Sequence, residues 1–317
     1  MKRLTVLGSV NADHVLNVSR FPQPGETLTG HNYRVIPGGK GANQVVAAAR
    51  MGAAPAFIAM VGEDAFGEQM LSAFAEEGID TRAVMTAVGK PSGIAIIQVN
   101  SEGENSICIA PESNACLTPE RLTEHLALIQ QADCLLMQLE TPLDTLMLAA
   151  KEAVEHNTQV ILNPAPATVL SDEFLQLVDV ITPNQTEAHA LTGIAVSDGD
   201  SAAQAAQVLH EKGIPLVIIT LGSQGAWVSR RTVDDASAGI ISGQMVPGFH
   251  VEVRDTTAAG DTFNGALACC LLEGKPLTDA VRIAHAAAAV SVTRDGAQPS
   301  VPVRQEVEAF MHNAAVL

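Results

Sequence analysis

Short apolar runs alternate with segments of helical periodicity along most of the chain, and this alternation predicts its main elements. The apolar runs are rich in Val, Ile and Leu and are about as long as a buried strand. Predicted strands cover residues 4–8, 56–61, 134–139, 159–162, 180–182, 216–220 and 226–229. Predicted helices cover residues 42–51, 65–77, 118–130, 143–156, 202–212, 259–272, 277–292 and 303–314. This order predicts an α/β fold with a Rossmann-like, doubly wound, mostly parallel sheet flanked by helices.

Four further segments break the alternation and resemble hairpin strands. They cover residues 10–18, 26–35, 93–100 and 106–110, with turn residues at 22–25 and 101–104. We expect them to form an additional antiparallel layer, with strands within about 10–36 and 92–111, on a single domain spanning residues 1–317. Another strand is predicted at 248–253. Residues 230–243 are expected to form an exposed loop, to which we assign no function.

Composition and charge exclude several classes of function. The formal charge is −17 over 317 residues, and such a chain lacks the basic surface that nucleic-acid backbones require. The five cysteines contain no C-x-x-C pair and are expected to be reduced core thiols. The start of the chain does not fit a signal peptide, and no run of about 18 apolar residues occurs. We therefore expect a cytoplasmic protein with no membrane or nucleic-acid partner.

The most informative stretch leads into the predicted helix at 259–272. The first turn of a helix has free N–H groups and a partial positive charge, so small residues there let a phosphate approach the backbone. Ala258, Ala259 and Gly260 leave that space and form the expected anion hole. Asp261 follows them, where it would either cap the helix or act as a base toward an attacking hydroxyl. A capping carboxylate would repel a bound phosphate, which favours the base.

Five motifs, taken together, resemble the ribokinase (PfkB) family of sugar and nucleoside kinases. Residues 255–265 (Asp-Thr-Thr-Ala-Ala-Gly-Asp-Thr-Phe-Asn-Gly) are similar to its C-terminal signature, and residues 38–44 (Gly-Gly-Lys-Gly-Ala-Asn-Gln) to its N-terminal one. Motifs at 163–166, 182–187 and 220–225 lie between them in family order, so the resemblance covers about residues 4–302. It implies that the additional strands form a β-sheet lid over the sugar.

Two other segments refine this resemblance. Residues 8–13 (Gly-Ser-Val-Asn-Ala-Asp) are similar to the ribose-phosphorylating members in particular. Residues 109–114 (Ile-Ala-Pro-Glu-Ser-Asn) depart from the pattern of those members, close to the predicted lid. The departure would alter either substrate choice or only the neighbouring surface.

Candidate sugar-binding residues lie near the start of the chain and after one strand. Asn11 and Asp13 are two residues apart in an extended segment, so both side chains point to one face and suit neighbouring hydroxyls. A turn cap would also explain them. Glu140 follows a strand at the edge where open α/β sheets bind ligands, although an exposed Glu at a strand end is equally ordinary. The resemblance implies contact with ribose for Asn11, Asp13, Gly39, Lys40, Asn43, Glu140 and Asp261.

Candidate nucleotide-binding residues follow two later strands. Asn184 and Glu187 are one helical turn apart, which fits a surface helix pair or contacts with the triphosphate and, through water, Mg²⁺. The glycines at 220–225 suit a loop that cradles phosphates, although no Walker sequence occurs. His285 would flank adenine by resemblance, or would only fill an apolar helix. The predicted set is Asn184, Thr220, Gly222, Ser223, Gly225, Gly260 and His285.

Two cations are expected with ATP. An acidic chain must hold a tetra-anionic nucleotide by local devices, so a kinase of this charge requires Mg²⁺. The family also has a monovalent-cation site beside the anion hole, built largely of backbone carbonyls with one carboxylate. The matching positions for K⁺ are Asp255, Thr257, Ser291, Arg294, Gly296 and Ser300.

The resemblance implies an ATP-dependent kinase that phosphorylates D-ribose at O5 with Asp261 as its base. It also implies a homodimer formed through the lid, since exposed strand edges favour pairing. One alternative is a related kinase acting on deoxyribose, another pentose or a nucleoside. Another is a sugar-binding regulator without catalysis, which would be free to lose Asp261. No G-x-G-x-x-G follows the first strand, which argues against a nicotinamide-dependent dehydrogenase.

Overall fold

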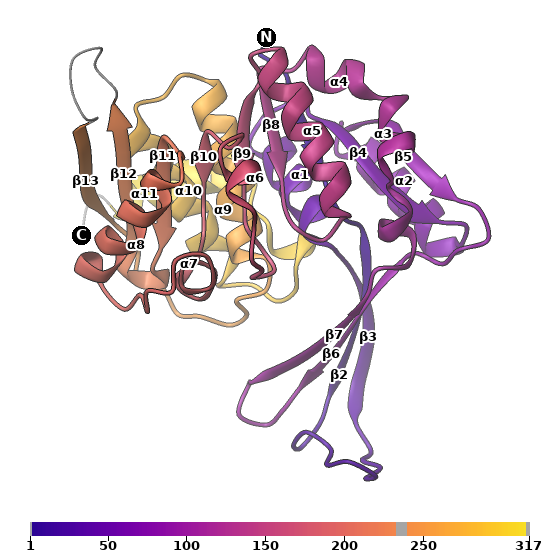
Figure 1. The fold of residues 1–317 in the computed structure, drawn as a ribbon. Coiled ribbons are helices and arrows are strands. Elements are labelled where there is room, and N and C mark those ends of the chain that lie inside the picture. Colours follow the sequence, from indigo (N-terminus) through magenta and orange to yellow (C-terminus); the bar gives the residue numbers. More distant parts are fainter. Residues whose placement is uncertain (1, 233–239, 315–317) are drawn as a thin grey trace.

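One large sheet with helices on both faces forms the body of the molecule, and a small second sheet projects from it (Figure 1). The computed structural model describes residues 2–232 and 240–314. The large sheet has the order β13-β12-β11-β10-β9-β8-β1-β4-β5. Strands β5 to β11 of that order pair in parallel, and β12 and β13 add an antiparallel edge. Its strands are β1 (Leu4–Leu7), β4 (Ala56–Gly62), β5 (Asp80–Ala87), β8 (Cys134–Met137), β9 (Gln159–Leu162), β10 (Val180–Ile181), β11 (Leu216–Thr220), β12 (Gly225–Thr232) and β13 (Ile240–Pro247).

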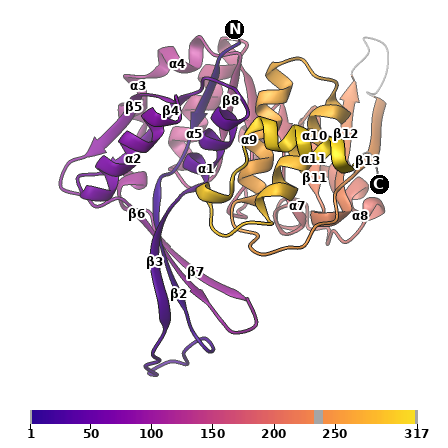
Figure 2. The same cartoon turned by 180° about the vertical axis from the view of Figure 1, so that it is seen from behind.

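Helices cover both faces of this sheet, as the opposite views of Figures 1 and 2 show. One face carries α1 (Lys40–Arg50), α2 (Ala65–Glu76), α9 (Ala259–Leu272), α10 (Leu277–Ser291) and α11 (Arg304–Ala314). The other carries α3 (Pro119–Thr123), α4 (Leu126–Gln130), α5 (Leu143–Glu155), α6 (Asp172–Leu175), α7 (Gln185–Thr192) and α8 (Gly199–Glu211).

Alternate side chains of each strand fill the two cores between the sheet and its helices. In β8, Leu136 packs on the α1 and α9 side, while Leu135 and Met137 pack on the α5 side. All three are fully buried, as expected for a parallel strand covered on both faces. Among the helices of residues 2–232 and 240–314, none is long and apolar enough to cross a membrane.

The small sheet, called the lid below, has the order β3-β2-β6-β7. It consists of β2 (Asn11–Asn17), β3 (His31–Gly38), β6 (Gly93–Val99) and β7 (Asn105–Ala110). Val15, Ala95 and Ile97 form a small buried cluster on one of its faces. The lid extends from the body in both views, on the side where the parallel strands end (Figures 1 and 2). Its root therefore lies at the same edge of the large sheet as the loops that follow β1, β8 and β11, and it is closest to the loop after β1.

The predicted α/β class, with a mostly parallel sheet and a small additional sheet, is confirmed. The expectation of a purely antiparallel lid is wrong, because β2 and β6 pair in parallel over seven residues. These strands reach the lid from the same edge of the body, so they run in the same direction. The second lid strand also begins later than predicted, at His31.

Three further predictions are corrected by the structure. Residues 248–253 form no strand, since β13 ends at Pro247 and the next six residues have no regular structure. The helix predicted at 118–130 is two short helices separated at Glu124 and His125. The loop predicted at 230–243 is partly strand, because β12 reaches Thr232 and β13 begins at Ile240; residues 233–239 lie outside the described part. Strand β5 was not predicted.

Candidate active site

The first turn of α9 is open and its backbone is shaped for an anion. Ala258 has φ 59° and ψ 14°, a left-handed conformation, and the following residues are helical. This sequence of conformations directs successive N–H groups to the same side, which makes an anion-binding nest. A Cβ placed on Gly260 would meet no protein atom within 4 Å, so the approach to these N–H groups is clear.

Asp261, in this first turn, is buried and held on both carboxylate oxygens. Its Oδ2 accepts a hydrogen bond from Asn43 Nδ2 at 2.9 Å, and its Oδ1 accepts one from Gln44 Nε2 at 2.9 Å. Burial raises the pKa of Asp261, while the Lys40 ammonium and the two amide donors oppose that rise. The carboxylate does not cap the helix, since α9 has no side-chain cap.

Three charged groups from different parts of the chain, Asp13, Lys40 and Glu140, gather beside Asp261. Burial, together with the negative charges of Glu140 and Asp261, raises the pKa of Asp13 to about 7. Burial disfavours the ammonium of Lys40, but the surrounding carboxylates, Asp261 first, raise its pKa above the ordinary value. Glu140 Oε2 accepts hydrogen bonds from Ser9 Oγ at 2.5 Å and from Lys40 N at 3.0 Å. The cluster is rich in hydroxyl acceptors and suits a neutral polyol better than an anion.

Backbone and amide groups complete this side of the site. Gly39 has φ +91°, and a Cβ there would lie 2.7 Å from Asn11 N, so only glycine fits between β2 and α1. Asn43 is buried, and its Oδ1 has no partner among the described residues. That buried oxygen therefore has unused capacity to accept a hydrogen bond. The predicted sugar residues from β2, α1, β8 and α9 thus lie together.

Asn114 is a neighbour of this cluster that was not predicted. Its Nδ2 donates to Asn11 Oδ1 at 2.8 Å and to Val10 O at 3.1 Å, and its Oδ1 accepts from Val10 N at 2.9 Å. Oδ1 of Asn11 therefore already accepts one hydrogen bond from within the protein. Asn114 belongs to the segment 109–114, whose unusual sequence was the only available signal, and Glu112 within it has φ 44°.

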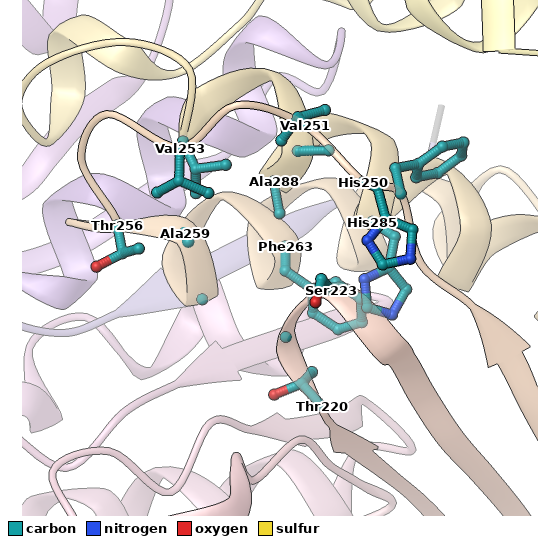
Figure 3. A pocket seen from close by; sticks show the side chains of 15 residues that line it. Thr220, Ser223, His250, Val251, Val253, Thr256, Ala259, Phe263, His285 and Ala288 are labelled. Atoms are coloured by element: carbon teal, nitrogen blue, oxygen red, sulfur yellow. The ribbon is translucent and has the colours of Figure 1, made fainter.

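A cavity of about 450 Å³ lies on the other side of the α9 N-terminus (Figure 3). Thr220, Gly222 and Ser223 line it from the turn between β11 and β12. The segment at 249–256, α9, α10 and the residue after α10 supply its mostly apolar remainder: Phe249, His250, Val251, Val253, Thr256, Ala259, Gly260, Phe263, His285, Ala288, Ala289 and Val292. A concave apolar site with a few polar groups at one end suits a nucleotide base.

His285 lies in this lining and is buried. Its ring packs on Phe263 with centroids 5.0 Å apart, and burial lowers its pKa to about 4. The imidazole is therefore neutral near pH 7, and its Nε2 has no partner among the described residues. Gly225, by contrast, does not line the cavity; a Cβ there would lie 2.0 Å from Val246 O, so it holds the turn against β13.

Asn184 and Glu187 form a capping box at the start of α7. Asn184 Oδ1 accepts from Glu187 N at 2.9 Å, and the Glu187 carboxylate accepts from Asn184 N and Nδ2, each at 2.9 Å. Burial raises the pKa of Glu187. The capping box fits the interpretation as a surface helix pair. Asn184 also forms an isolated β-bridge with Thr220, which lines the cavity, so a position near the phosphates fits as well.

The six positions matched to a cation site lie on two adjoining segments. Asp255 Oδ1 accepts from Thr257 N at 2.9 Å and Oδ2 from Gly296 N at 2.9 Å. Hydroxyls of Ser291 and Ser300 donate to Ala288 O and Ala297 O, and the Arg294 guanidinium pairs with Glu306. The side chains of Asp255, Ser291, Arg294 and Ser300 are thus engaged by neighbouring protein groups. In the described part of the chain, no group of three or more His, Cys, Asp or Glu residues could hold a metal ion.

Comparison with known proteins gives one consistent result. The model of the pfkB family carbohydrate kinase matches residues 1–304. Ribokinase of Haemophilus influenzae is 52% identical over 313 residues, which cover 99% of this chain and 99% of that protein. Ribokinase of Staphylococcus aureus is 38% identical, over 96% of this chain and 98% of that protein.

Solved structures agree with the sequence comparison. The structure of Arabidopsis thaliana ribokinase complexed with ribose and ATP has a TM-score of 0.87 and 32% identity, covering 98% of this chain and 99% of that one. Ribokinase from Thermotoga maritima has a TM-score of 0.85 and 38% identity, covering 99% and 100% of the two chains.

Proposed function

This chain belongs to the pfkB family of carbohydrate kinases, and we propose that it transfers the γ-phosphoryl group of ATP to O5 of D-ribose, giving D-ribose 5-phosphate and ADP. One observation carries the proposal. Buried Asp261 lies in the open first turn of α9, between the carboxylate-rich cluster and the 450 Å³ cavity. A sugar hydroxyl and a terminal phosphate bound on these two sides would meet at that turn.

Asp261 acts as the base in this mechanism. The O5–H bond of ribose breaks as its proton passes to the Asp261 carboxylate, while O5 bonds to the γ-phosphorus and the bond to the ADP oxygen breaks. The N–H groups of Ala258, Ala259 and Gly260 receive the equatorial oxygens of the migrating group. A positioned base of this kind contributes roughly 10²- to 10⁴-fold in rate.

The sugar is held by the cluster on the lid side. Asp13 and Glu140 accept hydrogen bonds from sugar hydroxyls, and Asn11, whose Oδ1 already accepts from Asn114, donates through its NH₂ group to a sugar oxygen. Asn43 accepts through its free Oδ1 and donates to Asp261, so it links the sugar to the base. Gly39 and Lys40 border the same space, and the lid covers it.

The nucleotide occupies the cavity. Its apolar lining takes the adenine against neutral His285, while Thr220, Gly222 and Ser223 lie toward the ribose and phosphates. Gly225 shapes this turn, and Asn184 stands between the turn and the start of α7.

The residues present fit a Mg²⁺ that ATP brings with it. Glu187 lies in the first turn of α7, whose N-cap Asn184 pairs with Thr220 of the cavity. Its two oxygens already accept hydrogen bonds, which favours contact with the ion through water. When bound, Mg²⁺ would neutralise phosphate charge, which a chain of charge −17 cannot do with its overall field.

The loops at 254–257 and 291–300 fit a monovalent cation held by carbonyl oxygens. The backbone of Val292 accepts from Arg254 N at 2.8 Å, and Asp255 binds Gly296 N, so the two segments are fixed beside the anion hole. K⁺ there would be held by carbonyls of Asp255, Thr257, Ser291, Arg294, Gly296 and Ser300. Activity is expected to rise with K⁺ at fixed ionic strength, and indifference to K⁺ would remove this site.

A homodimer formed through the lid is part of the proposal. The lid exposes Tyr33, Ile96 and Ile107, which are 61%, 55% and 53% accessible, beside two free strand edges. Ile107→Asp is expected to give monomers in size-exclusion chromatography with light scattering. Val169→Asp, at an 81% exposed residue outside the lid, is the matched control and should leave the dimer intact. The cytoplasmic location stays a prediction from the sequence.

ADP release across a panel of pentoses and nucleosides, with and without K⁺, tests the proposed reaction. D-ribose is expected to give the highest kcat/KM. Loss of the 2-hydroxyl leaves buried polar groups unpaired and costs roughly 1–3 kcal/mol, or about 5- to 150-fold against deoxyribose. A higher kcat/KM with another sugar would make that sugar the substrate of the same reaction. Sugar binding without ADP release would indicate a regulator.

A further inference from the structure

Gln44 is a buried amide directly behind the proposed base. It belongs to α1 and is fully buried, so it does not contact the substrate. Helices α1 and α9 approach closely here, since a Cβ on Gly265 would lie 2.5 Å from the carbonyl oxygen of Gln44. This approach brings the Gln44 side chain within 2.9 Å of the Asp261 carboxylate.

The orientation of the Gln44 amide is fixed by its other partners. Its Nε2 donates both to Asp261 Oδ1 and to Asn163 Oδ1, the latter at 3.0 Å. Its Oε1 accepts from Gln138 Nε2 at 2.6 Å. An ionised carboxylate only accepts, so the amide must point its nitrogen to Asp261, and Gln138 stabilises that orientation from the opposite side.

We propose that Gln44 is a positioning residue that holds Oδ1 of Asp261 from the protein interior and thereby leaves Oδ2 as the oxygen that receives the hydroxyl proton. Oδ2 accepts from Asn43 Nδ2, and the Oδ1 of that same amide has no partner among the described residues. The two adjacent amides of α1 thus serve different carboxylate oxygens. The inference rests on the proposed phosphoryl transfer and adds a residue to it.

Removing the Gln44 amide changes both the geometry and the proton affinity of Asp261. Its N–H stabilises the ionised carboxylate, so its loss raises the pKa of Asp261. The other charged groups facing Asp261 are Lys40 on α1, Asp13 on β2, Glu140 after β8 and Glu187 on α7. They remain in the variant and do not replace the lost donor.

Gln44→Met tests the proposal, because methionine preserves the shape and removes the hydrogen bonds. We expect kcat at pH 7 to fall at least about 10-fold and the acidic limb of the kcat profile to move up by about one pH unit. The Kd for ribose should change less than about threefold, since Gln44 does not reach the sugar. Gln138→Met should have a smaller effect in the same direction.

Thr158→Val is the matched control. Thr158 Oγ1 donates to the carbonyl oxygens of Ile129 and Ala132, and it is buried at the opposite end of β9 from Asn163. Thr158→Val should remove buried hydrogen bonds and lower Tm without moving the acidic limb of the kcat profile. If Gln44→Met also lowers Tm while kcat and the limb stay as in the wild type, Gln44 is only structural.

A second measurement separates this inference from the proposed function. The pKa of Asp261 can be read from its carboxyl carbon by NMR in the protein without substrates. A rise in Gln44→Met of about one pH unit supports the assignment whatever the sugar, and an unchanged pKa overturns it. Absence of ADP release by the wild type with every sugar would instead refute the proposed function.

Discussion

Replacing Gly260 with alanine tests whether the open space at the first turn of α9 is needed for folding or only for binding the phosphate. Apart from its chain neighbours and the backbone of its own helix, a methyl group at Gly260 meets no protein atom within 4 Å, and the residue lies within α9 without a positive φ. Alanine in place of glycine within a helix stabilises by up to about 1 kcal/mol, which corresponds to a rise in Tm of up to about 3 °C. The folded protein therefore tolerates the change.

Gly260 lines the cavity at the first turn of α9, so the same methyl group would enter the space proposed for the phosphoryl oxygens. Loss of even one such donor typically costs about 10²- to 10³-fold in kcat. Gly260→Ala should therefore lower kcat by about 100-fold or more while its Tm is unchanged or raised. The assays are thermal unfolding and coupled ADP release with ribose.

Gly265→Ala is the matched control on the same helix. Its Cβ would lie 2.5 Å from Gln44 O and 2.6 Å from Ala47 Cβ, so α1 and α9 must separate by roughly 0.5–0.9 Å. Such overpacking costs about 1–3 kcal/mol and lowers Tm. A wild-type kcat in Gly260→Ala would refute the proposal that the first turn of α9 binds the phosphoryl group. A Tm as low as that of Gly265→Ala would show that the space next to Gly260 is not open.

Two further predictions concern the sugar side. The pKa of Asp13 is about 7 in the folded chain against an ordinary value of 3.8, so the folded state binds this proton more tightly and loses stability as pH rises toward 7. Asp13→Asn should reduce the loss in free energy of unfolding between pH 5 and pH 8 by roughly 1–3 kcal/mol in urea titrations, and an identical pH dependence would contradict it. Asn114→Ala should weaken ribose binding through Asn11, so the Kd effects of Asn114→Ala and Asn11→Ala should be non-additive in a double-mutant cycle. Additive effects would make Asn114 a purely structural residue.

Local patterns predicted the parts of the fold that depend on burial. Strands such as Leu216–Thr220 are covered on both faces, so nearly every residue is apolar and the run is visible in the sequence. Glu140 and Thr220 lie at or beyond the carboxyl ends of such strands, where ligand sites of open α/β sheets form. Their approximate position could therefore be predicted without any structure.

Features that depend on distant partners were not predictable in this way. The apolar residues at 248–253 indicated burial, but Phe249, Val251 and Val253 line the cavity instead of pairing in a sheet. The parallel pairing of β2 and β6 depends on how both strands leave the body. Gln44 meets Asp261 across 217 positions in the sequence, and no local pattern records that contact.

Single-turnover phosphorylation by Asp261→Asn tests the central claim most directly. Asparagine has the size of aspartate but cannot accept the hydroxyl proton at neutral pH, so the rate of phosphoryl transfer should fall about 10²- to 10⁴-fold. Ribose binding, measured separately by calorimetry, should remain close to the wild-type affinity. A correctly folded Asp261→Asn protein that phosphorylates ribose at near the wild-type rate would contradict the account.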